Sequence, residues 1–71
     1  MTFEEFLTDC YATYSSESNQ RVGQYLVNKL RVVDLDLYCA MAQLSDVDPF
    51  YDDSLVPAFL VYISERWQNN A

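Results

Sequence analysis

The sequence predicts an all-α fold, a compact bundle of four short helices in a single domain over residues 1–71. Apolar residues recur at helical spacing in four separate runs, and the chain contains only one glycine. A hydrophobic content of 51% supplies enough apolar surface for a globular core. The four runs predict helices near residues 2–15, 19–33, 35–44 and 54–68.

The first helix is predicted to begin at a capping box. Thr2 is the expected N-cap, and Glu5 follows three residues later, so each side chain can bond the backbone N–H of the other. The polar segment 15–19 is expected to end this helix as a loop. Ser18 or Asn19 would then cap the second helix. The apolar face of the first helix comprises Phe3, Phe6, Leu7, Cys10 and Tyr14.

The second helix is the most specific part of the sequence. It contains Gly23, the only glycine, at a place where glycine costs roughly 1 kcal/mol relative to alanine. We therefore expect another backbone or a bulky ring to approach Gly23 closely. On that interpretation, Gly23→Leu destabilises the fold through overpacking by roughly 1–3 kcal/mol. The apolar stripe of this helix comprises Val22, Tyr25, Leu26, Leu30 and Val33, and its polar stripe comprises Arg21, Gln24, Asn28 and Arg31.

The third helix is expected to start with Asp34 or Asp36 as its cap. An acidic loop follows, in which Pro49 pushes the preceding residue out of helical geometry. Phe50 and Tyr51 stand next to each other in this loop. Because two adjacent aromatic side chains seldom both stay in water, we expect at least one of them to pack into the core.

The fourth helix is predicted to be apolar nearly all round. Pro57 is tolerated in its first turn, where the missing N–H would have no helical partner. The run from Leu55 to Ile63 is apolar apart from one phenol, so the helix should pack on more than one side. It is therefore expected to be either the central helix or one shared with a second copy in a homodimer. Residues 68–71 are expected to form a frayed tail.

The charge balance is the strongest compositional feature. Eleven acidic residues against four basic ones give a formal net charge of −7. Such a chain repels phosphate backbones, so direct binding of nucleic acid is disfavoured. The same field attracts a protein with a basic surface and speeds encounter with it. In the alternative interpretation, the acidic residues only keep a small protein in solution.

The composition also argues against catalysis and against cofactors. The chain has no histidine, and one glycine is too few for a glycine-rich phosphate loop. Cys10 and Cys39 lack zinc-ligand spacing and are expected to be buried free thiols, and the acidic loop lacks the glycine and glutamate of a calcium loop. We therefore expect no enzyme activity, no cofactor and no metal site. With no basic leader or membrane-length apolar run, the expected location is the cytoplasm.

A polar binding site is predicted where the second helix meets the acidic loop. The loop from Asp46 to Asp53 has polar backbone groups that need partners if an aromatic side chain pulls it inward. We predict that Asn28, with Gln24 or Arg21 beside it, hydrogen-bonds this loop. The alternative is that these three polar side chains are simply solvated. The candidate binding residues are Arg21, Gln24, Asn28, Asp48 and Tyr51.

Two motifs resemble those of a group of phage proteins. The pattern R-x-G-Q-x-x-x-N-x-L from Arg21 to Leu30, the D-P-F-Y at 48–51 and an aromatic helix ending in Trp67 resemble small uncharacterised proteins of bacteriophages and prophages. The resemblance covers most of the chain from Arg21 onward and implies a helical phage protein inside the host cell, without implying an activity.

The main functional hypothesis combines this resemblance with the charge. It is a binding protein that inhibits or redirects a host defence or nucleic-acid-handling protein with a basic surface. One alternative is a structural or assembly component that acts as a homo-oligomer. A second is a weak small-ligand binder that uses Arg21, Gln24, Asn28 and a loop aspartate.

Overall fold

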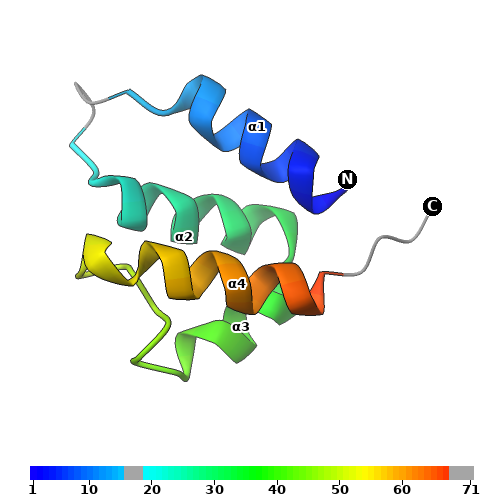
Figure 1. Cartoon of the computed structure of the whole chain (residues 1–71). Coiled ribbons are helices and arrows are strands. Elements are labelled where there is room, and N and C mark those ends of the chain that lie inside the picture. The colour runs from blue at the N-terminus through cyan, green and yellow to red at the C-terminus, as the bar shows by residue number, and fades with distance from the viewer. Residues whose placement is uncertain (16–18, 68–71) are drawn as a thin grey trace.

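The computed structural model describes residues 1–15 and 19–67, which form four α-helices and one short 3-10 helix (Figure 1). The prediction of an all-α bundle is confirmed, and the described residues contain no strand. The predicted end of the fourth helix at residue 68 and the predicted tail at 68–71 lie outside the described residues. In chain order the elements are α1 (Phe3–Thr13), α2 (Val22–Val33), α3 (Leu35–Ala42), η1 (Asp53–Leu55) and α4 (Val56–Arg66).

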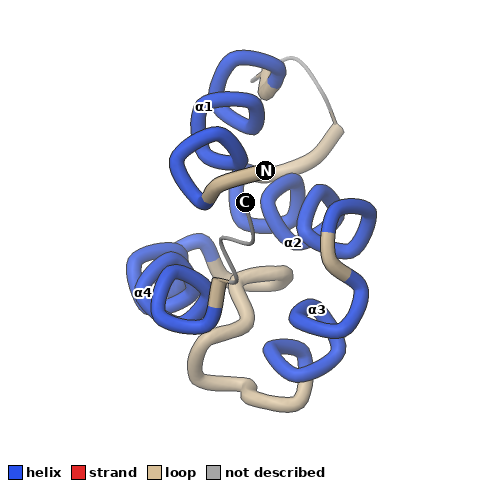
Figure 2. Tube along the Cα trace, turned by 90° about the vertical axis from the view of Figure 1, so that its right-hand side faces the viewer, coloured by secondary structure: helices blue, strands red, loops and turns tan. Residues whose placement is uncertain are grey.

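Helix α2 occupies the middle of the molecule. It lies between α1 on one side and α3 with α4 on the other (Figures 1 and 2). It contributes four buried residues, whereas α4 contributes only Phe59 and Ile63. The expectation that α4 might be the central helix is therefore wrong. Amphipathic α2 is more central because it packs against α1, α3 and η1.

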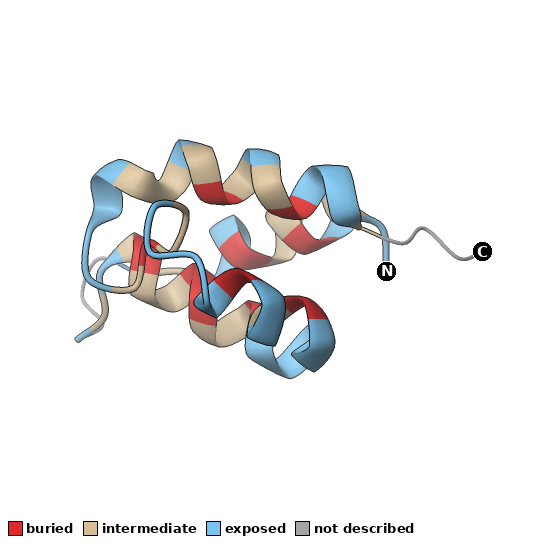
Figure 3. Cartoon of the chain, turned by 90° about the horizontal axis from the view of Figure 1, so that it is seen from below, coloured by how far each residue is buried: buried red, intermediate tan, exposed pale blue. Residues whose placement is uncertain are grey.

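The core is a single apolar cluster, and the buried faces of the helices turn toward one another (Figure 3). Val27 belongs to it, whereas Val33, which was predicted on the apolar stripe, is 39% exposed. Val33 is the last residue of α2, where the chain turns away toward α3, so no neighbouring helix covers it. The buried apolar residues are Phe6, Cys10, Leu26, Val27, Leu30, Leu37, Met41, Phe59 and Ile63.

The apolar surface of α4 is covered only in part by the rest of the chain. Phe59 and Ile63 are fully buried, and Leu60 and Tyr62 pack partly against the core. Val61 remains 58% exposed. Among the described residues nothing covers Val61, and self-association stays a prediction.

The predicted helix caps are confirmed at two starts. The N–H of Thr2 donates to Glu5 Oε1 at 2.7 Å, and the N–H of Glu5 donates to Thr2 Oγ1 at 3.1 Å, which completes the capping box. Of the two candidates for α3, Asp34 is the cap, because its Oδ1 accepts from the N–H of Leu37 at 3.1 Å. Pro57 lies in the first turn of α4, as expected.

The start of α2 differs from its prediction. The helix begins at Val22 rather than at residue 19, and Arg21 is the N-cap in an extended conformation without a side-chain cap of its own. Asn19 is therefore not the cap, and the other candidate, Ser18, lies outside the described residues. The carboxylate that caps the start of α2 comes from a residue that is distant in sequence.

Trp67 joins the end of α4 to the start of the chain. Its indole N–H donates to the carbonyl of Met1 at 2.9 Å. Its ring lies 5.8 Å from that of Phe3 and 5.0 Å from that of Phe6, between ring centroids. Residues from both ends of the described chain therefore close one edge of the core.

The two cysteines have different environments. Both are free thiols, but only Cys10 is buried, and burial raises its pKa to about 11. Cys39 is exposed, so the expectation of two buried thiols is wrong for this residue. It lies on the outer face of α3, which no other helix covers. In the part of the chain that the structure describes, no helix is long and apolar enough to cross a membrane.

Candidate functional site

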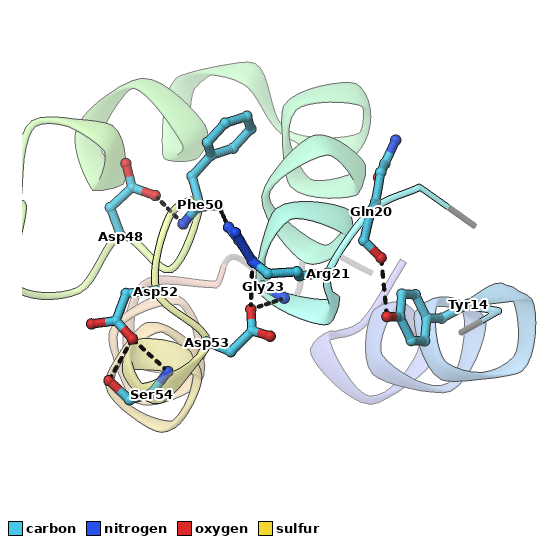
Figure 4. A network of polar contacts seen from close by, with 9 residues as sticks. All are labelled: Tyr14, Gln20, Arg21, Gly23, Asp48, Phe50, Asp52, Asp53 and Ser54. Carbon is cyan, nitrogen blue, oxygen red and sulfur yellow. Dashed lines mark hydrogen bonds and ion pairs between the residues drawn. The ribbon is translucent and has the colours of Figure 1, made fainter. Parts of the chain in front are cut away.

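The acidic loop, residues 46–53, is held in shape by its own carboxylates (Figure 4). Asp48 Oδ1 accepts from the N–H of Phe50 at 3.0 Å, which forms a tight turn around the buried Pro49. Asp52 Oδ1 accepts from the N–H and the hydroxyl of Ser54, at 3.0 and 2.7 Å. These bonds from Ser54 hold the pKa of Asp52 below its ordinary value. The Asp52 carboxylate thus stays ionised while it fixes the backbone.

The loop is tied to the start of α2 by Arg21 and Asp53. The Arg21 guanidinium donates to the carbonyl of Phe50, and its Nε lies 3.6 Å from Asp53 Oδ1. The same carboxylate oxygen accepts from the N–H of Gly23 at 3.0 Å. Asp53, which is distant in sequence but adjacent in space, therefore caps α2. This contact explains why the helix starts without a local cap (Figure 4).

Gly23 is where the loop comes closest to α2. A Cβ built on Gly23 would collide with the carbonyl oxygen of Pro49, and it would lie 2.7 Å from Asp53 Oδ1 and 3.1 Å from Pro49 Cβ. The predicted approach of another backbone to this glycine is therefore confirmed. The absence of a side chain allows Asp53 to reach the Gly23 N–H.

The predicted role of Asn28 is wrong. Its amide Nδ2 donates to Gln20 Oε1 at 3.5 Å and does not bond the acidic loop. Asn28 follows Arg21 by seven residues, which is about 10 Å along a helix, whereas the loop crosses only the first turn of α2. Half-buried Gln24 forms no hydrogen bond to the described part of the loop. Of the three polar residues predicted to bond the loop, only Arg21 does so.

The two adjacent aromatic residues have opposite environments. Phe50 packs partly against the core, as expected for at least one of the pair. Tyr51 is 85% exposed. The two rings stand edge to face with centroids 4.8 Å apart, so the anchored ring supports the exposed one. Among the five predicted site residues, Tyr51 is the one most available to a partner.

All four basic residues of the chain are engaged by other groups of the chain. Their partners are Asp53 for Arg21, Asp9 for Lys29, the Tyr38 ring for Arg31, and Glu65 with the Tyr62 ring for Arg66. The exposed Asp46 has no basic partner within the described residues. The surface of the acidic loop is therefore negative, with Arg21 as its only internal counter-charge.

The acidic loop and the start of α2 are better suited to contact a macromolecule than to enclose a small-molecule ligand. Arg21 and Asp53 already bond each other and backbone groups, so only part of their hydrogen-bonding capacity remains for a ligand. Among the residues that the structure describes, no group of three or more His, Cys, Asp or Glu side chains is placed to hold a metal ion. A half-open pocket of about 270 Å³ lies elsewhere, and none of the predicted site residues lines it.

The sequence contains a signal for the Asp53 contact at the start of α2. Arg21 is a poor N-cap, and Gly23 follows two residues later, inside the first turn. A helix start without a local cap, next to a lone glycine, indicates that an acceptor arrives from elsewhere.

No protein-family model, curated protein or solved structure matches this chain.

Proposed function

We propose that this chain is a binding protein that docks on a basic surface of another protein through its acidic loop, with Tyr51 as the anchor. The observation that carries this proposal is the 85% exposure of Tyr51 on a loop fixed by bonds on both sides. Tyrosine is one of the residues that dominate binding energy at protein interfaces, because its ring buries a large area and its hydroxyl bonds a partner.

The order of the loop supports this role. Arg21 holds the Phe50 carbonyl, Asp48 holds the Phe50 N–H, and Asp53 bonds the start of α2. A loop that is already ordered loses little conformational entropy when a partner covers it. Tyr51 can thus be presented to a partner at a small entropic cost.

The charge indicates the kind of partner. Asp46 and Asp52 are exposed on either side of Tyr51, and the whole chain carries a charge of −7. Opposite charge on the partner speeds encounter and selects against acidic surfaces. A host defence or nucleic-acid-handling protein with a basic groove is the kind of target that this charge suits, and it would be inhibited or redirected when that groove is covered. Nucleic acid itself is repelled by the same charge.

Affinity capture with matched tyrosine variants tests this proposal. Immobilised wild type, Tyr51→Ala and Tyr11→Ala would each be exposed to a bacterial lysate at low and high salt. Tyr11 is a suitable control because it is 50% exposed but lies on α1, away from the loop. We expect wild type and Tyr11→Ala to retain the same basic protein at low salt, and Tyr51→Ala to bind that protein at least about tenfold more weakly. Equal capture by all three, or no capture by any, would reject the proposal.

A second candidate function is that of a homo-oligomeric structural component. It is favoured by the exposed aliphatic residues Val61 and Val32, which are 58% and 84% exposed. The third hypothesis, a weak small-ligand binder built on Arg21, has less support. The guanidinium of Arg21 already bonds the Phe50 carbonyl and pairs with Asp53, so fewer of its N–H groups remain for a ligand.

A further inference from the structure

Helix α3 has an apolar face that no other described part of the chain covers. The helix lies at the edge of the molecule and packs against α2 and α4 (Figures 1 and 2). Its eight residues are apolar apart from Asp36, but only Leu37 and Met41 are buried. Three exposed residues follow one line along the opposite side of the helix, because they are four and three positions apart. This line, which we call the α3 stripe, comprises Leu35, Cys39 and Ala42.

The two sides of the α3 stripe carry opposite charges. Successive residues of a helix are about 100° apart, which puts Asp36 on one side of Cys39 and Tyr38 on the other. Asp36 is exposed and forms no hydrogen bond or ion pair with a described residue. The guanidinium of Arg31, from the last turn of α2, lies over the Tyr38 ring, 5.9 Å from its centroid. An anion therefore borders one side of the stripe, and a cation borders the other.

Neither of these two charges has an oppositely charged partner among the described residues. The other three basic residues of the chain each form an ion pair, whereas Arg31 contacts only the neutral ring of Tyr38. Contact with the face of a ring leaves the N–H groups of a guanidinium able to donate. Arg66 lines the same pocket as Asp36, but its ion pair is with Glu65. The uncharged stripe thus lies between an unpaired cation and an unpaired anion.

A second copy of the chain can supply the missing partner on each side of the stripe. In a two-fold dimer the same surface meets itself, so each contact occurs twice. When two facing helices run parallel, the two-fold axis lies along them, and the Asp36 side of one stripe meets the Arg31 side of the other. Asp36 and Tyr38 differ by about 3 Å along the helix axis, so a guanidinium over Tyr38 can reach the carboxylate. In an antiparallel pair, like charges would meet.

The α3 stripe is also a surface on which two acidic molecules can approach each other. Each chain carries a net charge of −7, which opposes association of surfaces that bring carboxylates together. The stripe itself carries no charge, and its apolar groups are stabilised when they leave water.

We propose that two copies of this chain form a dimer in which the α3 stripes face each other in parallel, with Arg31 of each copy paired to Asp36 of the partner subunit. One eight-residue helix from each copy buries less than a standard interface of roughly 1,600 Å², so the dimer is weak and forms at high micromolar concentration. The α3 stripe contains no residue of the acidic loop, so the proposal does not depend on the role of Tyr51.

Sedimentation equilibrium of full-length charge variants tests this proposal. Asp36→Lys places a cation against Arg31 of the other copy and should weaken dimerisation about tenfold, although it lowers the net negative charge. Asp46→Lys makes the same change of charge on the exposed acidic loop, so it is the control and should leave dimerisation equal or stronger. Combining Asp36→Lys with Arg31→Glu restores the opposite charges at the net charge of wild type, and should return dimerisation to within about threefold of wild type. Circular dichroism checks that each variant keeps its helices.

Cys39 provides a second measurement on the same variants. It lies in the middle of the stripe and is exposed, whereas Cys10 is buried. Mild oxidation with copper phenanthroline should therefore join two Cys39 thiols in one disulfide and give a covalent dimer, which Cys39→Ser abolishes and Asp36→Lys reduces. Equal dimerisation or equal crosslinking of Asp36→Lys and Asp46→Lys, or failure of the double variant to recover, would overturn the proposal. A dimer lost in Val61→Ser but kept in Asp36→Lys would overturn it too, because the contact would then lie on α4.

Discussion

At the scale of single residues, Gly23 is required by its neighbours and not by its backbone conformation. None of the described residues has a positive φ, so any amino acid could adopt the backbone at this position. What excludes a side chain is the carbonyl of Pro49 and the carboxylate of Asp53. Because the Pro49 contact is to backbone, it cannot be relieved by a rotamer change.

Gly23→Ala should therefore destabilise the protein by about 1–3 kcal/mol, even though alanine gains roughly 1 kcal/mol in helix propensity. Urea denaturation measures the change in the free energy of unfolding. Gln24→Ala, at the next position of the same turn, is the control and should stay within about 0.5 kcal/mol of wild type. A Gly23→Ala variant as stable as the parent would mean that the loop moves away from α2 at little cost.

The difference between Arg21 and Asn28 gives a second prediction for single residues. Arg21→Ala removes a charged hydrogen bond to the Phe50 carbonyl and an ion pair with Asp53, and should cost about 1–2 kcal/mol. Asn28→Ala removes only a long bond to Gln20 and should cost less than about 0.5 kcal/mol. The comparison uses the midpoints of chemical denaturation, and the reverse order of the two values would contradict the geometry of the site.

At the scale of elements, the free N–H groups in the first turns of α1 and α2 are capped in different ways. The start of α1 is capped locally, by the reciprocal bonds of Thr2 and Glu5. The start of α2 is capped by Asp53, which reaches the N–H of Gly23 from the far side of the acidic loop. Formation of α2 therefore depends on tertiary structure, whereas α1 carries its own start signal.

The capping box of α1 makes part of the stability depend on pH. The bonds with Thr2, first from its backbone N–H and then with its side chain, hold the pKa of Glu5 below its ordinary value of 4.5. A carboxyl group with a lowered pKa contributes stability that is present above its unfolded-state pKa and is lost as the pH falls through the folded-state value. Glu5→Gln keeps the hydrogen-bonding shape without the titration.

We therefore expect wild type to melt at a higher temperature than Glu5→Gln at pH 7, and this difference to shrink as the pH is lowered below about 4.5. Thermal unfolding followed by circular dichroism measures it. Glu4→Gln removes a carboxylate from the same turn without altering the capping box, so it reports the effect of charge alone. A difference between wild type and Glu5→Gln that does not change with pH would argue against this role of Glu5.

The elements also show which features could be predicted from sequence. The number of helices and the Thr2 capping box follow from spacing and local chemistry, so they were predictable. The start of α2 was not, because its acceptor, Asp53, lies thirty residues from Gly23. Asn28 was misassigned because a helical pattern gives the face of a residue but not the turn that a distant loop crosses. The exposure of Cys39 likewise depends on which neighbours cover α3.

At the scale of the whole molecule, exposed aliphatic surface and net charge act in opposite directions. Val61 on α4 and Val32 at the end of α2 favour contact with a second copy. A charge of −7 on each chain opposes it. Added salt screens the repulsion and strengthens apolar association, so it shifts this balance.

We predict self-association that increases with salt at high micromolar concentration. Light scattering at low and high ionic strength measures it, and Val61→Ser tests whether α4 is responsible. A strict monomer under both conditions would remove the homo-oligomer hypothesis. A dimer unaffected by Val61→Ser would place the contact on another surface.

The ties between α2 and the acidic loop also bear on the order of folding. The bonds from Arg21 and Gly23 join residues that are 29 and 30 positions apart in the chain. Closing so long a segment costs chain entropy before any bond compensates for it. We therefore expect these contacts to form after the helices and to be largely absent from the folding transition state. Arg21→Ala should then accelerate unfolding and leave the refolding rate nearly unchanged. Tyr51 would then take up its exposed position only in the last step of folding. A partner that binds this surface would bind the folded protein and not partly folded chains.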